Sequence, residues 1–319
     1  MTELDASRAE TPAVCVVVLN RHGREYTAQC LRHLAAVVYP GLRAVLIDNG
    51  CAEFSAEEVH RLMPGAAYLR TEVNRGFTGG VNLGIQHALA GGAAYVFLLN
   101  NDTRIDPNAI AELIAVANRD ANIGIVGAKL LQLDAPDTLE SAGVRVELSW
   151  GRIYQIGFGE RDRGQYDAAA DVPAVSGGAI LLSRAVCERL SGFDDRYFRY
   201  LEDVDVCLRA RAAGFRVVLC PRARVYHKGK GMTGGKTGAV TLYYATRNHL
   251  LLMREHAGGG SLVRTLRALI VLGLNTAYAL RAGSGSVADR LAAVGQGARD
   301  YRAGALGPGW SDSGRSSGA

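Results

Sequence analysis

The side chains best suited to chemistry are acids and amides that directly follow short apolar runs. Asp102 comes after the apolar run 94–99 and two amides, Asn100 and Asn101. A carboxylate beside amide oxygens is a hard-oxygen site of the kind that binds Mg²⁺ or Mn²⁺, often together with substrate phosphates. The same residues could instead cap a helix that begins near Pro107. The sequence leaves both interpretations open.

A second group of acids, Glu202, Asp203 and Asp205, stands where a helix is expected to begin. The helix dipole stabilises negative charge at that end, which would be a purely structural reason for the cluster. A carboxylate among the aromatic side chains of 197–200 can also acquire the raised pKa that a general base needs. Asp203 and Asp205 are two positions apart and cannot both face one ligand from a helix. We therefore predict that one acid acts and the others cap.

His227 lies in a Gly/Lys segment, 225–231, together with Lys228 and Lys230. Free backbone N–H groups and ammonium groups suit phosphate, and the imidazole could complete the shell of a diphosphate-bound metal. The stretch from Val206 to Arg254 holds ten Lys or Arg residues and no Asp or Glu. This block favours a phosphate-like ligand over nucleic acid. The alternatives are a structural histidine and a solvated basic face.

The elements that must position these side chains follow the rhythm of an α/β domain. Strands are expected over 13–19, 43–47, 67–70 and 94–99, and they alternate with helices that begin near residues 25, 55 and 79. This order predicts a mostly parallel sheet, whose ligands bind beyond the carboxyl ends of the strands. Asn20, Asp48 and the 100–102 segment would then meet at one edge. The glycine-rich turn 74–84 is weak as a nucleotide motif but brings backbone close to a ligand.

The rest of the chain is less regular. Strands are expected near 123–131, 175–182 and 215–220, the last ended by Pro221, with a helix over 204–213. With 48% hydrophobic and 21% charged residues, the chain can form a sizeable core. Six scattered cysteines without a CxxC pair argue against zinc or disulfides and favour a reducing compartment.

No signal peptide is expected from the polar, acidic start of the chain. The longest apolar stretch, 268–280, is short of the roughly 20 residues that span a bilayer. Arg264, Arg267 and Arg281 flank it, a pattern compatible with an amphipathic helix on a membrane surface. Packing on the catalytic domain, or on a second subunit in a homodimer, is the alternative.

Seven motifs in a fixed order resemble the inverting glycosyltransferases of family two with the GT-A fold, especially their rhamnosyltransferase-like branch. They are VVVLN (16–20), LIDNG (46–50), NRGFTGGVNLG (74–84), LLNNDT (98–103), VSGGAILLSR (175–184), GFDDRYFRYLEDVDVCLRARAAGF (192–215) and VYHKGKG (225–231). The resemblance covers about residues 13–255 and implies a GT-A-type α/β fold with a helical C-terminal extension. It divides the chain into a disordered lead (1–12), a catalytic domain (13–258), the extension (259–306) and a flexible tail (307–319). Within the catalytic domain, 13–123 would bind the nucleotide sugar and 124–258 would hold the acceptor and the catalytic base.

The resemblance also implies a role for each candidate residue. Asp203 would deprotonate the acceptor hydroxyl, while Asp102 and His227 would hold Mg²⁺ or Mn²⁺ on the diphosphate. Asp48 would hold the pyrimidine base. The remaining donor-binding candidates are Asn20, Asn74, Gly76, Asn101, Lys228 and Lys230. Acceptor-side candidates are Glu202, Tyr243 and Arg247, with packing as the alternative for the last two.

The implied donor is dTDP-L-rhamnose or another dTDP-deoxysugar, with a UDP-sugar next. The implied acceptor is a saccharide, lipid-linked, or a secondary metabolite, in a cytoplasmic protein compatible with peripheral contact at the inner membrane face. Asn100 replaces an acid that is frequent in the family, which leaves a degenerate nucleotide-sugar-binding protein as an alternative. A sugar nucleotidyltransferase is a second alternative, although only one glycine follows the first strand closely. A two-carboxylate glycosidase would not explain the basic loop.

Overall fold

The computed structural model describes residues 11–229, 238–281 and 285–309. Its central sheet has ten strands in the order β10-β12-β6-β11-β4-β1-β2-β3, with β5 paired to β12 and β7 paired to β6. The strands are β1 (Val14–Asn20), β2 (Leu42–Asn49), β3 (Ala67–Thr71), β4 (Tyr95–Asn100), β5 (Thr103–Ile105), β6 (Ile123–Gln132), β7 (Leu139–Ser141), β10 (Ala170–Asp171), β11 (Ala179–Ser183) and β12 (Arg216–His227). A separate hairpin joins β8 (Val144–Glu147) to β9 (Arg152–Gln155).

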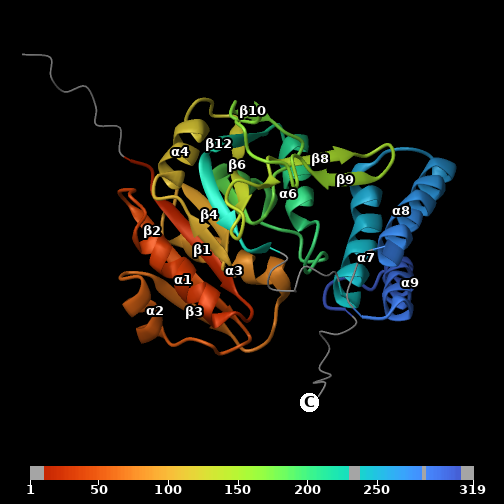
Figure 1. Cartoon of the computed structure of the whole chain (residues 1–319), viewed down its shortest axis with the longest axis horizontal. Coiled ribbons are helices and arrows are strands. Elements are labelled where there is room, and N and C mark those ends of the chain that lie inside the picture. Colours follow the sequence, from red (N-terminus) through yellow and green to blue (C-terminus); the bar gives the residue numbers. More distant parts are fainter. Residues whose placement is uncertain (1–10, 230–237, 282–284, 310–319) are drawn as a thin grey trace, which may run out of the picture.

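Helices cover both faces of the sheet (Figure 1). They are α1 (Arg24–Ala35), α2 (Ala56–Leu62), α3 (Gly76–Ala90), α4 (Ala109–Ala117), α5 (Arg184–Leu190) and α6 (Glu202–Ala212). Alternate residues of β1 pack into different clusters, Val16 with α1 and α4, and Val17 with α3 and α6. Burial on both faces explains the unbroken apolar runs of these strands.

The expected α/β fold is confirmed, with parallel pairing of β1 to β2 and β4, of β2 to β3, and of β6 to β12. β11 runs antiparallel between β4 and β6, which brings the glycines that precede it to the end of β4.

Two local expectations were wrong, and both errors concern the site. Pro221 does not end its strand, because β12 continues to His227 through a register shift between Cys220 and Arg224. A bulge accommodates a proline without ending the pairing. Thr103–Ile105 is not a helix cap but a short strand, and it pairs with the last residues of β12.

Three further helices, α7 (Ala239–His256), α8 (Ser261–Arg281) and α9 (Val287–Ala303), pack together beside the sheet (Figure 1). α8 has 21 residues and is long and apolar enough, by length and composition, to cross a membrane. The expected apolar stretch was therefore too short. Beyond α9 the Gly307 N–H donates to the Arg196 carbonyl, so the described chain stays hydrogen-bonded past the residue where a tail was expected to begin.

Candidate active site

Strand pairing brings Asp102 and His227 together. In the β5–β12 ladder Thr103 lies opposite His227, and the Lys228 N–H donates to the Asp102 carbonyl over 2.9 Å. His227 Nε2 consequently lies 3.0 Å from Asp102 Oδ1, although 125 positions separate them in sequence. On its other side, His227 Nδ1 lies 2.8 Å from Glu140 Oε1 on β7.

The histidine is held between two carboxylates in a mostly buried position. Burial alone would lower the pKa of His227, but the hydrogen bonds and charges of Asp102 and Glu140 outweigh it and raise the pKa to about 10. A carboxylate behind a histidine is also the arrangement that orients an imidazole toward a metal. Asp102 and His227, with Glu140 behind, therefore form a donor set that fits a divalent cation.

Sequence reasoning missed Glu140. It lies in the irregular stretch between β6 and β11, where no periodicity or motif distinguishes it from the other acids nearby. Only the pairing of β7 with β6 brings it to His227.

Asp203 lies near the start of α6 and contacts the glycine turn that precedes β11. The Gly177 N–H donates to Asp203 Oδ2 over 2.8 Å, and a Cβ on Gly177 would lie 3.1 Å from the Cβ of Asp203. The next residue, Gly178, accepts a hydrogen bond from the Asn100 N–H over 3.0 Å. The turn thus connects Asp203 to the end of β4, and burial raises the pKa of this carboxyl while the N–H groups of Gly177 and Val204 oppose the shift.

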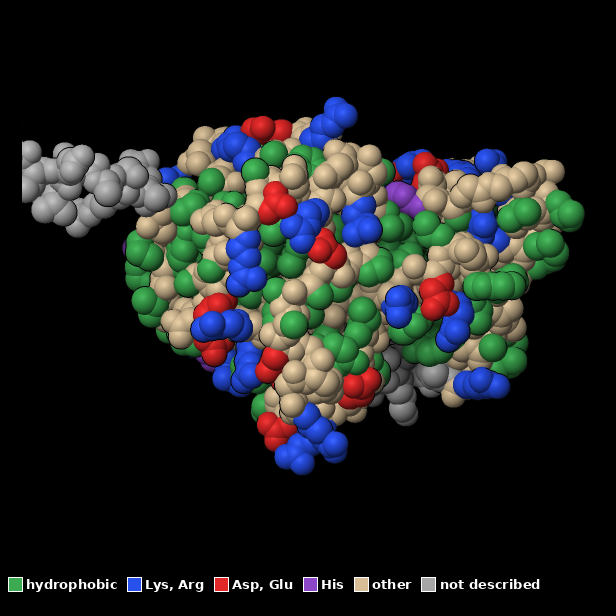
Figure 2. Space-filling view, turned by 90° about the horizontal axis from the view of Figure 1, so that it is seen from above, with side chains coloured by type: hydrophobic (Ala, Val, Ile, Leu, Met, Phe, Trp, Pro, Cys, Tyr) green, Lys and Arg blue, Asp and Glu red, His purple; other side chains and the backbone are tan. Residues whose placement is uncertain are grey.

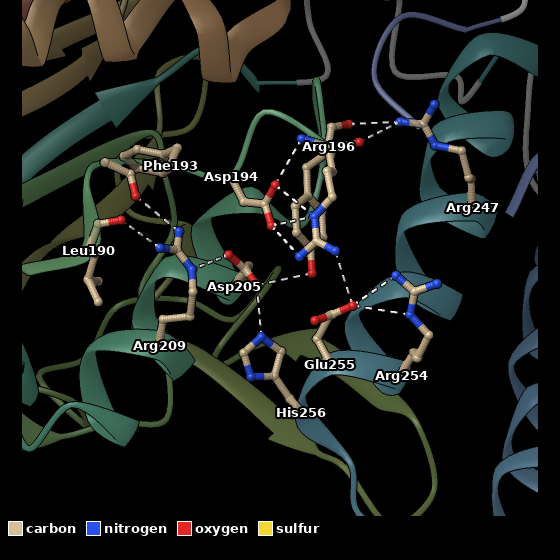
Figure 3. Close-up of polar contacts among 12 residues, drawn as sticks. Leu190, Phe193, Asp194, Arg196, Asp205, Arg209, Arg247, Arg254, Glu255 and His256 are labelled. Carbon is tan, nitrogen blue, oxygen red and sulfur yellow. Dashed lines mark hydrogen bonds and ion pairs between the residues drawn. The ribbon is translucent and has the colours of Figure 1, made fainter. Parts of the chain in front are cut away.

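The neighbouring acids have different surroundings. Glu202 is buried, its Oε2 has no hydrogen-bond partner among the described residues, and burial followed by the charge of Asp203 raises its pKa to about 8. Asp205 points elsewhere and accepts hydrogen bonds from Tyr197, Arg209 and His256 (Figure 3). Asp203 and Asp205 thus have separate partners, as predicted, but Asp205 ties α6 to α7 instead of capping a helix.

On the donor side, Asp48 does not present a free acceptor. It is completely buried, and its two oxygens accept from the backbone N–H groups of residues 51–54, from the Cys51 thiol and from the Tyr68 hydroxyl. The geometry therefore does not support the expected contact with a pyrimidine base. Asp48 instead shapes the loop after β2.

Asn20 and Asn101 are also used within the protein. Asn20 accepts from Thr27 and from Asn101, and its amide donates to Glu53 over 3.1 Å. These bonds hold the ends of β1 and β4 together. The two amides meet as predicted, and their contacts are structural.

One further group of potential metal ligands lies near Asp48. His22, Cys51 and Glu53 bring three such atoms within 4.8 Å of one another. Burial, followed by the hydrogen bond to Asp48, raises the pKa of Cys51 to about 11, so its thiol stays protonated. This chemistry does not favour a metal there.

The 74–76 loop contacts the segment that leads to Asp203. Asn49, missed in the sequence, accepts from the Arg75 N–H and donates to the Gly76 carbonyl over 2.8 Å. Gly76 has φ +74°, and a Cβ there would lie 2.4 Å from the Phe198 ring. The Phe77 N–H donates to the Phe198 carbonyl over 2.6 Å. The donor loop and the catalytic loop, residues 196–201, are therefore packed together.

Tyr243 and Arg247 do not line an open acceptor site. Both are buried, and Tyr243 donates to Asp300 on α9 over 2.6 Å. The Arg247 guanidinium donates to the carbonyls of Arg196, Tyr197 and Gly307 (Figure 3). The packing alternative holds for both residues because carbonyl oxygens and aromatic rings surround the cation.

Most cations of the basic block have protein partners. Lys228 pairs with Asp134, Arg222 with Glu112, and Arg216 with Asp120 and Asp171. The block is therefore not a single phosphate cradle, and Lys230 lies outside the described residues.

A mixed sheet of this order, with an acid at the end of β4 and a second acid across a glycine turn, defines a GT-A-type glycosyltransferase. Two solved structures share the fold. The mannosyltransferase PcManGT of Pyrobaculum calidifontis, in complex with GDP-Man and Mn²⁺, has a TM-score of 0.58 at 15% identity over 92% of this chain and 88% of its own. Staphylococcus aureus TarS 1-349 with UDP-GlcNAc has a TM-score of 0.57 at 14% identity over 92% and 84%.

The sequence comparisons give the family. The pattern "Glycosyltransferase like family 2" matches residues 12–244, and the chain belongs to this family. An N-acetylglucosaminyl-diphospho-decaprenol L-rhamnosyltransferase of Mycobacterium tuberculosis is 25% identical over 78% of this chain and 86% of its own length. The hexosyltransferase Agl10 of Haloferax volcanii is 24% identical over 57% of this chain and 58% of its own.

Proposed function

We propose that the chain is an inverting glycosyltransferase that moves a deoxysugar from a dTDP-linked donor to a hydroxyl of a lipid-linked saccharide. The preferred donor is dTDP-L-rhamnose, with a UDP-sugar second. The observation that carries the proposal is the glycine turn Gly177–Gly178, which contacts Asp203 on one side and the strand end leading to Asp102 on the other. Similarity to the mycobacterial L-rhamnosyltransferase supports the choice of donor and acceptor class.

Asp203 supplies the base in this mechanism. Its raised pKa suits proton transfer, and each carboxylate oxygen accepts one N–H, from Gly177 or Val204. The acceptor oxygen forms a bond to the anomeric carbon while the bond from that carbon to the donor diphosphate breaks. The proton passes to Asp203, and the electron pair leaves with the nucleoside diphosphate. A single displacement inverts the configuration without a covalent enzyme intermediate.

Asp102 and His227 would hold Mg²⁺ or Mn²⁺, and Glu140 would orient the histidine. When bound, the cation supplies positive charge to the leaving diphosphate. Asn100 adds an amide 3.2 Å from His227 Nε2, so this position contributes a dipole where an acid would contribute charge.

The test is transfer by Asp203→Asn, with Asp137→Asn as a control at an exposed carboxylate. Losing a general base lowers turnover by about 10²–10⁴-fold. Nucleotide binding, measured as a thermal shift with dTDP or UDP and Mg²⁺ or Mn²⁺, should stay within a few-fold. Wild-type turnover by Asp203→Asn would remove this residue as the base. Nucleotide binding by the native chain without transfer or donor hydrolysis would favour the degenerate binding protein.

The acceptor class needs its own experiment. Transfer to a diphospho-polyprenol-linked saccharide should exceed transfer to the same saccharide without the lipid. Equal rates on the two acceptors, or transfer only to small secondary metabolites, would contradict the lipid-linked acceptor.

A further inference from the structure

The outward face of α8 is apolar. Leu262, which is 71% exposed, shares this face with Leu266, Leu269 and Leu280, which are also exposed. Spacings of three, four and eleven residues keep these side chains on one side of a helix. The opposite side buries Val271 and Ala279, and α8 packs on α7 and α9. The helix therefore hides one apolar side and presents another, unlike a helix with only a core to cover.

The β8–β9 hairpin extends this surface. Trp150, at its tip, is 63% exposed and lines an open hollow of about 500 Å³ together with Val263, Leu266 and Leu269. The adjacent Gly151 packs close to Val271. Trp150 and the exposed leucines of α8 thus form one continuous apolar surface, called here the α8 face.

The charges around the α8 face are positive. α8 contains Arg264, Arg267 and Arg281 and no acid, and the first and last of these are exposed. The hairpin adds exposed Arg145 and Arg152. Figure 2 shows hydrophobic side chains, with Lys and Arg nearby, at the end of the molecule where α8 lies.

We propose that the α8 face docks on the surface of an anionic lipid bilayer at the cytoplasmic side, with α8 lying flat. An amphipathic helix with arginines beside its apolar side, together with a tryptophan at the edge, is suited to the headgroup boundary. The inference rests on the proposed lipid-linked acceptor, whose saccharide would project from that surface. Spanning is disfavoured because α7 and α9 cover one side of α8.

A second copy of the chain fits this face less well. A two-fold interface brings the same surface against itself, so the arginines beside α8 would approach their own copies with no acid on α8 to offset them. An anionic lipid surface supplies the missing negative charge.

The first test is flotation of the full chain with vesicles of phosphatidylcholine, with and without phosphatidylglycerol. The Leu266→Gln/Leu269→Gln double variant should lower binding about tenfold or more, because two exposed leucines no longer enter the apolar layer. Val38→Gln is the matched control, since Val38 is 69% exposed and lies elsewhere, after α1. Arg264→Gln/Arg281→Gln should lower binding only to the anionic vesicles.

Trp150 gives a second readout. The sequence has two tryptophans, so Trp310→Phe leaves Trp150 as the sole emitter. Its emission should shift to the blue when anionic vesicles are added. Absence of both the shift and flotation would overturn the proposal. So would a native dimer that Leu266→Gln/Leu269→Gln dissociates, with no vesicle binding, because a second copy would then cover the face.

The lipid result is separable from the proposed function. Nucleotide binding without vesicles depends on the donor site alone. Intact nucleotide binding with no flotation would refute the membrane inference only, whereas flotation without nucleotide binding would refute the glycosyltransferase proposal.

Discussion

Asn248 holds the catalytic loop in place, and its replacement tests how strongly. The side chain is buried on α7, and its Nδ2 donates to the carbonyls of Tyr197, Arg199 and Tyr200 over 2.9, 2.7 and 2.9 Å. These carbonyls belong to a loop in which Phe198, Tyr200 and Leu201 have positive φ. Each such residue stores strain of about 1–2 kcal/mol, which the surrounding contacts must offset.

Asn248→Asp keeps the size of the side chain and exchanges its donor group for an oxygen. The amide has two hydrogens for three acceptors, so about two full hydrogen bonds are lost. At about 1–3 kcal/mol for each buried acceptor left unsatisfied, we expect a loss of about 3–5 kcal/mol in the free energy of unfolding. Relaxation of the strained loop should also displace Asp203, which begins two residues after it, and lower kcat.

The assay is urea denaturation followed by circular dichroism, paired with kcat at saturating donor and acceptor. Asn248→Ala should be less damaging than Asn248→Asp because it adds no repulsion. Asn108→Asp makes the same chemical change at an exposed position and should stay within about 0.5 kcal/mol of the native protein. An unchanged urea midpoint in Asn248→Asp would refute the proposed anchoring. A lower midpoint with native kcat would show that loop strain and the position of Asp203 are independent.

Three further predictions follow from the site. Gly76→Ala should lower the free energy of unfolding by about 2 kcal/mol or more, because a Cβ would enter the Phe198 ring at positive φ; Gly41→Ala, also at positive φ but in open space, is the control, and equal losses in the two variants would contradict the steric argument. The pKa of Glu202 is raised from 4.5 to about 8, so the folded state binds this proton more tightly and stability falls as pH rises through that window. Glu202→Gln should flatten this decline in urea titrations from pH 5 to 8, and an unchanged slope would rule out Glu202 as its source. Glu140→Gln should weaken Mn²⁺ binding about 10–100-fold by calorimetry, whereas native affinity would exclude the orienting role.

The fold was predictable because each β-strand of the first half is an apolar run of the right length, bounded by polar turns. The convergence of strand ends on one edge follows from parallel pairing alone. The meeting of Asp102 with His227 could not be predicted from the residues. It depends on β12 continuing through the Pro221 bulge, a feature that local propensity disfavours.

The errors share one physical cause. Residue type indicates which chemistry is available but not which partner takes it up. Asp48 and Arg247 carry the charges expected of ligand contacts, yet in the folded chain N–H groups, hydroxyls and carbonyls surround them. These partners lie in other elements, so no spacing in the sequence identifies them.

The hydrogen bond from Arg247 to the Gly307 carbonyl has a consequence for folding during synthesis. A nascent chain leaves the ribosome from its N-terminus, so the catalytic loop emerges well before α7, and long before Gly307. Until those later segments arrive, Phe198, Tyr200 and Leu201 lack the carbonyl partners that keep them at positive φ. The central sheet can therefore form cotranslationally, whereas Asp203 reaches its final position only after the last helices have docked.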